Sequence, residues 1–289
     1  MAKVSICIPC YQHLDNVANL LESIQKQTYQ DIEVIITDDT ETDEIGLYIE
    51  NIRDAEFRKK IKYQHNSNKL GFIFNWNEAL SRASGELIKI MFSDDWFTFE
   101  DSLAKMVEML EQNPGASIAF TGTRQVSTGR TRERYAGDLF IERLREDARN
   151  LFLGNEIGAP SATIYRRCGV MFDEKSNWAS DMFLYFDILQ QNGNFAYTRE
   201  PLISIGESDE QYTYTFSDTD ERKYQDYKYM YEKYYLRDSK SCRQYFLEQF
   251  LVPYDKSPVE VKRAGISCMQ AFVYAWKTHK KYFLRCWRK

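Results

Sequence analysis

The stretch VSICIPCYQ, residues Val4 to Gln12, opens the pattern that decides the fold. Its first five residues form a short apolar run typical of a buried strand, and Pro9 follows the run. Apolar residues at helical spacing then alternate with further strand-like runs. This alternation predicts an α/β fold with a mostly parallel, twisted sheet flanked by helices. The further runs lie at residues 33–36, 61–64, 87–92 and 117–120.

The length of 289 residues, 43% of them hydrophobic, suits one large domain with an extension. The strand–helix pattern fades near residue 205, after which the chain is helical and rich in tyrosine. We therefore expect a sheet domain over residues 1–205 and a helical extension over residues 206–289. Four tyrosines in the extension, at spacings of 3, 4 and 3, predict a packed helix face, with a sugar-binding platform as the alternative. They are Tyr224, Tyr227, Tyr231 and Tyr234.

Several classes of protein are disfavoured by composition. No secretory signal opens the chain, and no apolar run approaches the ~20 residues of a membrane-spanning helix, so we expect a cytoplasmic protein. A reducing compartment makes a disulfide scaffold from the six cysteines improbable, and three scattered histidines give no zinc cluster. The net charge of −5 argues against nucleic-acid binding, although residues 262–289 hold eight basic residues and no acidic one.

Cys7 and Cys10 have the spacing of a thiol redox centre, and they also end a strand that could present a loop to a ligand. In a redox centre the strand turns directly into a helix, whose amino end activates the thiol. Here Cys7 lies inside the strand, Pro9 intervenes, and the helix begins only near Asp15. The pattern therefore favours a packing role for Cys7 and a loop role for Cys10.

Acidic side chains follow two further strands of the predicted sheet. Asp38-Asp39 ends the second strand, and Ser93-Asp94-Asp95 follows the fourth. Each pair alone is typical of a turn or a helix cap. Ligands of such sheets bind beyond the carboxyl ends of the strands, where four carboxylates together suit Mg²⁺ or Mn²⁺ shared with a phosphate ligand. Glycine-rich phosphate loops are missing, so the pattern favours a nucleoside diphosphate neutralised by a cation.

Four stretches in this order carry a family resemblance. Together they resemble the family 2 inverting glycosyltransferases of the GT-A fold, of the bacterial surface-polysaccharide type, over roughly residues 3–205. The resemblance makes residues 1–205 the nucleotide-sugar transferase domain. The stretches are VSICIPCYQ, EVIITDDTETD, HNSNKLGFIFNWNEALSRASGELIKIMFSDDW and NWASDMFLYFDILQQNG.

The resemblance implies a role for particular residues. Asp181 matches the catalytic base, Asp95 the ligand of Mn²⁺ or Mg²⁺, and Asp39 the partner of the uracil base. Two positions depart from the family pattern, because Ser180 stands where a Glu is common and Ser93 leads the acidic motif. The implied reaction is a single displacement with inversion, in which Asp181 deprotonates an acceptor hydroxyl and the metal assists the leaving diphosphate. The nucleotide-binding residues implied are Pro9, Tyr11, Asp39, Asn68 and Asp94, with Gly71 close by.

Candidate contacts with an acceptor, and the basic tail, each have two possible interpretations. Trp178, Trp96 and the pair Arg166-Arg167 are candidates for contacts with a glycan acceptor, with core packing or a solvated strand end as the alternatives. Residues 262–289 combine aromatic and basic side chains, as in a helix that lies on an anionic membrane surface, with a role in solubility or dimer contact as the alternative.

The expected function is transfer of a sugar from a nucleotide-sugar donor, a UDP-sugar in the first place, to a glycan acceptor. By family analogy that acceptor is carried on a polyprenyl diphosphate at the inner face of the cell membrane. A nucleotidyltransferase is the nearest alternative, but residues 9–16 lack the glycine-rich basic loop that it requires. The second alternative is a non-catalytic scaffold that binds a nucleotide or a glycan, and such a protein would not need Asp181 as a base.

Overall fold

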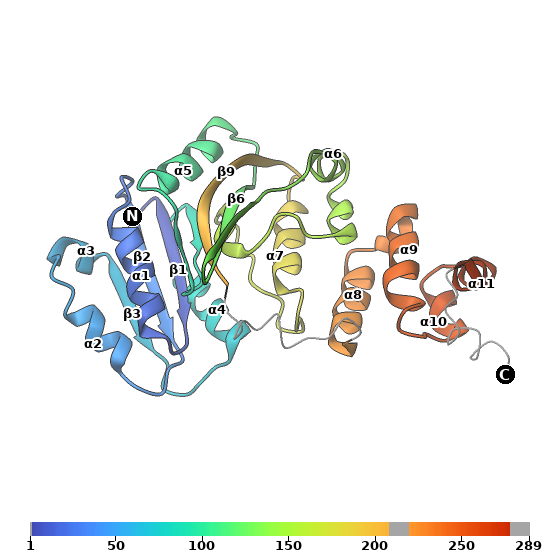
Figure 1. Ribbon diagram of the computed structural model, residues 1–289, viewed down its shortest axis with the longest axis horizontal. Helices are drawn as coiled ribbons and strands as arrows, with labels where there is room; N and C mark the ends of the chain where they lie inside the picture. Colours follow the sequence, from blue (N-terminus) through green and yellow to red (C-terminus); the bar gives the residue numbers. More distant parts are fainter. Residues whose placement is uncertain (1, 208–219, 278–289) are drawn as a thin grey trace.

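A computed structural model describes residues 2–207 and 220–277 (Figure 1). Within this part of the chain the strands form one nine-stranded sheet in the order β3-β2-β1-β4-β8-β6-β9-β5, with β7 paired to β6. The prediction of an α/β fold with a twisted sheet and a helical C-terminal part is confirmed. The strands are β1 (Val4–Cys10), β2 (Ile32–Asp38), β3 (Ile61–His65), β4 (Leu87–Ile90), β5 (Asp95–Phe97), β6 (Ile118–Ser127), β7 (Arg130–Arg134), β8 (Thr163–Arg166) and β9 (Phe195–Gly206).

The half of the sheet formed by β3, β2, β1 and β4 is parallel, and the other half is mixed. Val4 pairs with Ile32 on β2 and with Leu87 on β4, so the three strands start at one edge and end at the opposite edge. β8 runs antiparallel to β4, whereas β6 and β9 are parallel to each other. The carboxyl ends of β1, β2 and β4 therefore share one edge, and β8 ends at the other.

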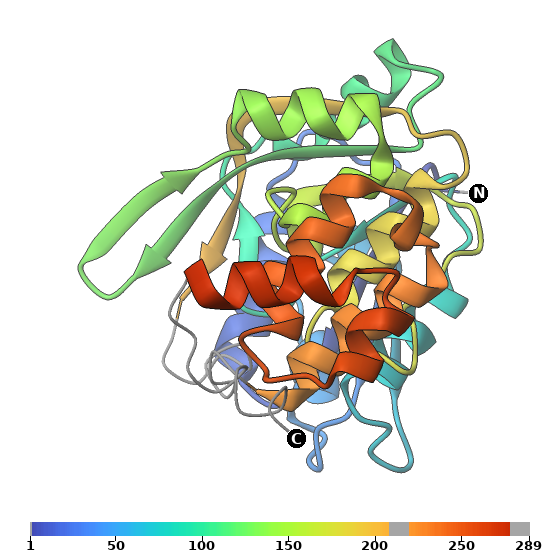
Figure 2. The same ribbon diagram turned by 90° about the vertical axis from the view of Figure 1, so that its right-hand side faces the viewer.

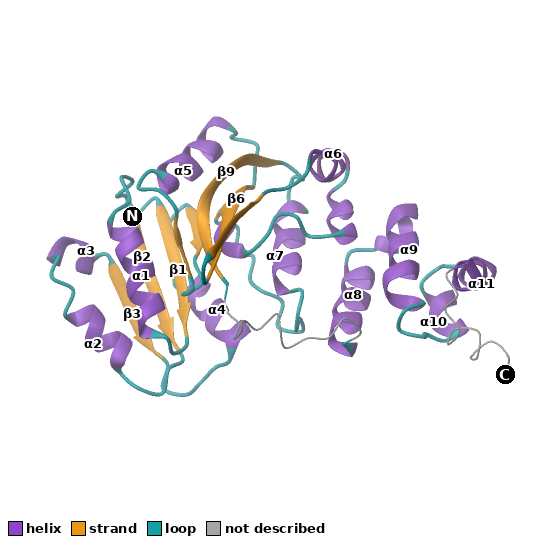
Figure 3. Ribbon diagram, in the orientation of Figure 1, coloured by secondary structure: helices purple, strands orange, loops and turns teal. Residues whose placement is uncertain are grey.

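Helices cover both faces of the sheet (Figure 3). Apolar side chains of α1, α2, α3 and α5 pack on one face, and those of α4, α6 and α7 pack on the other, with α8 to α11 beyond α7 (Figure 1). The helices are α1 (Leu14–Gln25), α2 (Glu44–Glu50), α3 (Ala55–Lys59), α4 (Phe72–Ser81), α5 (Ser102–Gln112), α6 (Asp138–Glu146), α7 (Ser180–Leu189), α8 (Glu221–Lys233), α9 (Lys240–Phe246), α10 (Pro258–Arg263) and α11 (Cys268–Lys277).

The two cysteines of β1 lie on opposite faces of the sheet. Cys7 packs in the cluster around α4 and α7, whereas Cys10 packs in the cluster around α1. Both thiols are free and buried, and burial raises their pKa. This arrangement agrees with a packing role for Cys7, but Cys10 is a buried strand residue and not the loop residue that the sequence suggested.

The sequence of residues 121–158 predicts loops and a short helix, but the structure contains more regular structure there. β6 continues to Ser127 and pairs with β7 in a long hairpin, which projects from the body of the molecule (Figure 2). Its turn contains Gly129 at a φ of 73°, a conformation that glycine adopts without strain. α6 and a 3₁₀ helix at Ala148–Leu153 then lead back to the sheet.

The C-terminal helices form a tyrosine-rich layer against α7. All four tyrosines of the predicted stripe are buried, so the helix-packing interpretation is confirmed. Tyr234 stacks on Phe186 of α7 with ring centroids 4.4 Å apart, and Tyr227 stacks on Phe250 at 4.1 Å. In the part of the chain that the structure describes, each helix is too short or too polar to span a bilayer.

Candidate active site

The ends of β1 and β2 are joined by a buried asparagine of α4. The Asn75 side chain donates to the backbone carbonyls of Cys10 (3.0 Å) and Thr37 (3.2 Å), and it accepts from Asn66 (3.0 Å). Thr37 in turn donates to the Asn75 carbonyl through its hydroxyl group (3.0 Å). These bonds tie the ends of β1 and β2 to α4, and they fix the edge on which the site is built.

Asp39 follows β2 and holds the loop at residues 66–71. Its carboxylate accepts from the Asn66 side chain (2.7 Å) and from the backbone N–H groups of Leu70 (3.1 Å) and Gly71 (2.8 Å). Gly71 has a φ of 87°, a conformation that would be strained in a residue with a side chain, and it is the N-cap of α4. Asp39 is only 4% exposed. Because three donors of the loop bind its two carboxylate oxygens, Asp39 holds the loop in its conformation.

The same loop closes over the residue that follows β1. Lys69 places its Nζ 3.7 Å from the centroid of the Tyr11 ring, which is 39% exposed. Asn68 lies in this loop with its side chain exposed, whereas Pro9 is buried within β1 and pairs with Thr37. The structure thus brings Tyr11, Asp39 and Asn68 together at the ends of β1 and β2.

The acidic motif follows β4 and is held by the end of β9. Asp95 starts β5 and pairs with Ile205, and the Gly206 N–H donates to the Asp94 carbonyl at 3.2 Å. A Cβ at Gly206 would lie 2.5 Å from that carbonyl oxygen, so only glycine fits here. Ser161 contributes a hydrogen bond to the Asp95 carboxylate and accepts from the Phe92 N–H at 3.0 Å.

Asp95 is a buried carboxylate beside a second carboxylate. It is 2% exposed, and burial together with the Asp94 charge raises the pKa of Asp95 well above its ordinary value. Nearby, Lys89 is fully buried and donates to the Ser161 carbonyl, and burial lowers the pKa of Lys89 to about 7.

A hard divalent cation fits this oxygen-only pair of acids. The described residues contain no group of three His, Cys, Asp or Glu side chains placed to hold a metal. Mg²⁺-type sites commonly use one or two carboxylates and take their remaining ligands from water and substrate phosphates. Asp94 and Asp95 therefore fit a cation that a diphosphate helps to bind.

Asp181 lies in the first turn of α7. Its Oδ2 accepts from Asn155 Nδ2 at 2.6 Å and its Oδ1 from the Met182 N–H at 2.8 Å. Burial raises the pKa of Asp181 to about 6, although these two hydrogen bonds and the charge of Arg134 act to lower it. A carboxylate with a pKa just below neutral pH is largely ionised and still basic enough to accept a proton.

One short segment links Asp181 to the acidic motif. Asn155 binds Asp181 at one end, and Ser161 binds Asp95 at the other. Midway, the Gly158 carbonyl accepts from the Tyr185 hydroxyl of α7 at 2.9 Å. Six residue steps span at most about 20 Å. The segment 155–161 therefore limits how far apart Asn155 and Ser161, the partners of Asp181 and Asp95, can lie.

The start of α7 is held by a carboxylate of α8. Asp226 is 1% exposed and accepts from the backbone N–H groups of Asn177 (2.9 Å), Trp178 (2.6 Å) and Ala179 (2.9 Å). Its Oδ1 also accepts from the Asn177 side chain at 3.2 Å. Because Ala179 has no capping side chain of its own, Asp226 supplies the cap from the helical extension.

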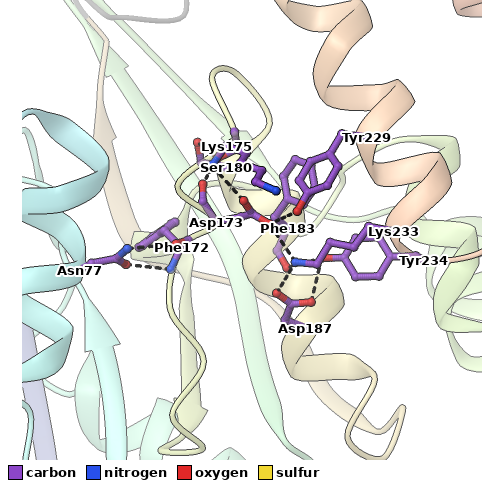
Figure 4. A network of polar contacts seen from close by, with 11 residues as sticks. Asn77, Phe172, Asp173, Lys175, Ser180, Phe183, Asp187, Tyr229, Lys233 and Tyr234 are labelled. Carbon is purple, nitrogen blue, oxygen red and sulfur yellow. Dashed lines mark hydrogen bonds and ion pairs between the residues drawn. The ribbon is translucent and has the colours of Figure 1, made fainter.

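A second set of contacts fixes the loop before α7 (Figure 4). Asn77 of α4 binds both the N–H (2.8 Å) and the carbonyl (3.0 Å) of Phe172. Lys233 of α8 lies between Asp173 and Asp187, 2.9 Å from each (Figure 4). The loop that carries Asp181 is thus tied on one side to α4 and on the other to α8.

The acceptor candidates are placed differently from one another. Trp178 is half-buried just before Asp181, with its ring 6.1 Å from that of Tyr227. Trp96 lines a hollow of about 390 Å³ between α1 and the segment after β5, on the other face of the sheet from α7.

Arg166 lies at the opposite edge of the sheet, beside Leu87, and its guanidinium donates to the carbonyls of Ala116 (2.9 Å) and Leu110 (2.7 Å). Its neighbour Arg167 donates to the Gly85 carbonyl at 2.7 Å. The expectation that Arg166 meets the acceptor is therefore wrong, because β8 is antiparallel to β4.

Four further residues of the site carry no motif that the sequence reveals. Asn75 and Asn155 act through side-chain amides, Lys89 is a charge inside an apolar strand, and Asp226 lies 45 positions after Asp181. Lys89 was the one residue of these four with a signal in the sequence, because it lies within the apolar strand run Leu87–Ile90 and lysine is rarely buried without a polar partner.

Known proteins share the first part of the chain. Residues 5–171 match the family described as Glycosyl transferase family 2. A relative from Campylobacter jejuni, "GalNAc(5)-diNAcBac-PP-undecaprenol beta-1,3-glucosyltransferase", is 33% identical over 96 residues, which are 33% of this chain and 30% of that protein. The match thus spans less than a third of the relative's length.

Solved structures share the fold at low identity. A crystal structure of Staphylococcus aureus TarS 1–349 in complex with UDP-GlcNAc superposes with a TM-score of 0.61 and 18% identity, over 77% of this chain and 65% of that one. A mannosyltransferase from Pyrobaculum calidifontis, in complex with GDP-Man and Mn²⁺, gives 0.57 and 20%, over 82% and 65%.

Proposed function

Because the chain belongs to glycosyl transferase family 2, we propose that it transfers a sugar from a nucleoside-diphosphate donor, in the first place a UDP-sugar, to a hydroxyl of a glycan acceptor with inversion. One observation carries this proposal. The segment 155–161 contacts a carboxylate suited to a cation–diphosphate pair at one end and a carboxylate suited to a base at the other.

The nucleotide is assigned to the ends of β1 and β2. Tyr11 offers an aromatic ring beside the loop 66–71, and Asp39 holds that loop in place. Pro9 shapes the strand end from within, and Asn68 adds an exposed amide. Following the family resemblance, we assign Asp94 to the ribose side and Asp95 to the metal on the donor diphosphate.

Mn²⁺ or Mg²⁺ is the proposed cofactor, held by Asp95 with Asp94 beside it. When bound, the cation offsets negative charge on the diphosphate as it leaves. On the other side, Asp181 accepts the proton of the acceptor hydroxyl at its carboxylate. Asn155 orients that carboxylate through the 2.6 Å hydrogen bond, and Trp178 is the proposed contact of the acceptor sugar.

The test is a donor screen with matched variants. Purified protein, Mn²⁺ and a panel of nucleotide sugars are incubated, and the released nucleoside diphosphate is measured. Asp181→Asn should lose transfer by about 10²–10⁴-fold while UDP still binds. Asp187→Asn, on the same helix but bonded to Lys233 and Tyr234, is the control and should keep its activity. Normal turnover of Asp181→Asn would remove Asp181 from the role of base.

Asp95→Ala addresses the metal independently. It should weaken UDP binding in calorimetry when Mn²⁺ is present and leave the weaker, metal-free binding unchanged. An unaltered titration in Mn²⁺ would exclude Asp95 as a metal ligand.

We also propose that the extension rests on the inner face of the membrane, where a lipid-linked acceptor would lie. Four apolar side chains of α11 point outward at spacings of 3, 1 and 3, while Ala271 and Ala275 pack inward. Such a stripe beside basic residues is typical of an interfacial helix. The four outward-facing side chains are Met269, Phe272, Val273 and Trp276. The tail residues beyond 277, including Lys280, lie outside the described residues.

Vesicle flotation tests this attachment. The protein should float with vesicles containing anionic phosphatidylglycerol and not with pure phosphatidylcholine. Phe272→Ser with Trp276→Ser should reduce flotation, whereas Leu47→Ser, an exposed apolar residue of α2, should not. Equal flotation of all variants would argue against the α11 surface.

A further inference from the structure

Lys89 is a fully buried lysine in the strand that leads to the acidic motif. Alternate residues of a strand share a face, so its side chain lies with Leu87 and Met91 on the α1 side of the sheet. Taking an ammonium group out of water is costly, and a lysine here requires compensating contacts. Both hydrogen bonds that it makes within the described residues go to backbone carbonyls, those of Ser161 and of Ile90 (3.3 Å). The lysine thus joins the end of β4 to the segment that contains Ser161.

Ser161 carries this contact on to Asp95. Lys89 binds the carbonyl of Ser161, whose hydroxyl group bonds the Asp95 carboxylate. The same hydroxyl oxygen accepts from the Phe92 N–H at 3.0 Å. Lys89 Nζ also lies 5.6 Å from the centroid of the Phe97 ring, within the range of a cation–π contact. Because Phe92 and Phe97 flank the acidic motif in the sequence, Lys89 and Ser161 contact both ends of the turn that carries Asp95.

Lys89 and Ser161 also act on the Asp95 carboxylate in the same direction. Burial and the Asp94 charge raise the pKa of Asp95, whereas the Ser161 hydrogen bond and the Lys89 charge act to lower it. A carboxylate binds a cation in its ionised form, so both groups favour the form that the metal requires. The hold of Lys89 on the two carbonyls does not depend on its charge, because an uncharged amine still donates through its N–H groups.

We infer that Lys89 is a positioning residue of the metal site: it holds Ser161 in place, and Ser161 holds the Asp95 carboxylate in the orientation that binds the cation. The inference rests on the proposed function and adds a residue to its donor side. A lysine that served packing alone could be replaced by an apolar side chain of similar length without effect on the cation, since apolar replacements of buried charges often preserve the fold.

The test is calorimetric titration of the full chain with UDP, once in Mn²⁺ and once in EDTA. Loss of a group that orients a metal ligand typically costs about 10- to 100-fold in affinity. Lys89→Met removes the ammonium group and keeps the length of the side chain. It should weaken UDP binding in Mn²⁺ by about tenfold or more and leave UDP binding in EDTA unchanged.

Two further variants test the route through Ser161. Ser161→Ala removes only the hydroxyl group and should cause a loss of similar size in Mn²⁺. The double variant should lose no more than the larger of the two single losses, because both changes break the same link.

Lys62→Met is the matched control. Lys62 lies on β3 and bonds the buried Glu33 carboxylate at 2.5 Å, away from the acidic motif. Its loss should lower the melting temperature and leave UDP binding in Mn²⁺ unchanged, which separates a loss of stability from a loss of metal-dependent binding.

Three results would overturn the inference: wild-type UDP binding in Mn²⁺ by either single variant, equal losses in Mn²⁺ and in EDTA, or additive losses in the double variant. Asp95→Ala separates these outcomes from a failure of the proposed function. If Asp95→Ala weakens UDP binding in Mn²⁺ and Lys89→Met does not, the role of Lys89 alone is refuted. If neither variant weakens it, the assignment of Asp95 as the metal ligand is refuted as well.

Discussion

Replacing Asp226 should damage catalysis from outside the catalytic helix. Its carboxylate accepts hydrogen bonds from four donor groups, three of them the backbone N–H groups of residues 177–179. Asp226→Asn keeps one acceptor oxygen in place but removes the charge, whereas Asp226→Leu leaves all three backbone donors unpaired. Hydrogen bonds to charged groups contribute about 1.5–3 kcal/mol each, and a buried unpaired donor costs about 1–3 kcal/mol.

The two variants should therefore differ in size of effect. We expect Asp226→Asn to lower the free energy of unfolding by about 2 kcal/mol and Asp226→Leu by about 5 kcal/mol. For a chain of this length, each kcal/mol corresponds to about 2 °C in the melting temperature. Misplacing a catalytic group by ~1 Å can cost ~10²-fold in rate. We therefore expect kcat to fall about tenfold in Asp226→Asn and about 100-fold in Asp226→Leu, with the donor KM unchanged.

The assay combines thermal melting with steady-state transfer at saturating donor. Asp187→Asn serves as the control, because Asp187 also joins α7 to α8, through Lys233 and Tyr234, but lies two turns beyond Asp181. It should lower the melting temperature and leave kcat within twofold. If both variants reduce kcat in proportion to their loss of stability, Asp226 supports the fold alone and the reasoning is refuted.

Three further predictions follow from the site and its scaffold. With Asp181 at a pKa of about 6, transfer at saturating substrate should fall about tenfold per pH unit below that value, and residual transfer by Asp181→Asn should be independent of pH from 5 to 8. Gly206→Ala should displace the Asp94 carbonyl and weaken UDP binding in Mn²⁺ at least tenfold by calorimetry, unlike Gly115→Ala, whose Cβ would lie 3.9 Å from its nearest neighbour. Burial acts to raise the pKa of Glu33, but hydrogen bonds from Lys62, Ser5 and Ser84 outweigh it and hold this pKa at about 2. The stabilisation of the fold by the Glu33 carboxylate is therefore complete above pH 5 and is lost as pH falls toward 2. Thermal melts should show Glu33→Gln less stable than wild type at pH 7, and the difference in melting temperature should shrink at pH 3.

The sequence was informative where the decisive contacts are local. Short β-branched runs predicted β1 to β4, because buried parallel strands are apolar on both faces, and helical spacing predicted α1, α2 and α4 between them. The acids Asp39, Asp94 and Asp95 were found by their position just after strands, and the structure places them at one edge. The hairpin was missed because β7 is entirely polar and exposed, so its only local signal was the Thr128-Gly129 turn.

Strand direction was the main source of error. The run Ser161–Tyr165, which Arg166 follows, predicts a strand, but nothing within it tells whether that strand is parallel to β4. A parallel strand would have put Arg166 at the ligand edge, whereas the antiparallel pairing with Leu87 puts it at the other. The direction of β8 depends on the chain that connects β6 to β8, for which the sequence predicted only loops and a short helix over residues 121–158.

The two sides of the site depend on different parts of the chain. The residues assigned to the nucleotide lie within residues 5–171, where the family match ends. Asp181 comes after that match, and the carboxylate that caps its helix belongs to α8, in the extension. Because Asn77, Asp226 and Lys233 together fix the loop before α7, a change in the extension can move Asp181 without touching the donor side. A substitution in α8 should therefore alter the proposed acceptor side while the proposed nucleotide side is unchanged.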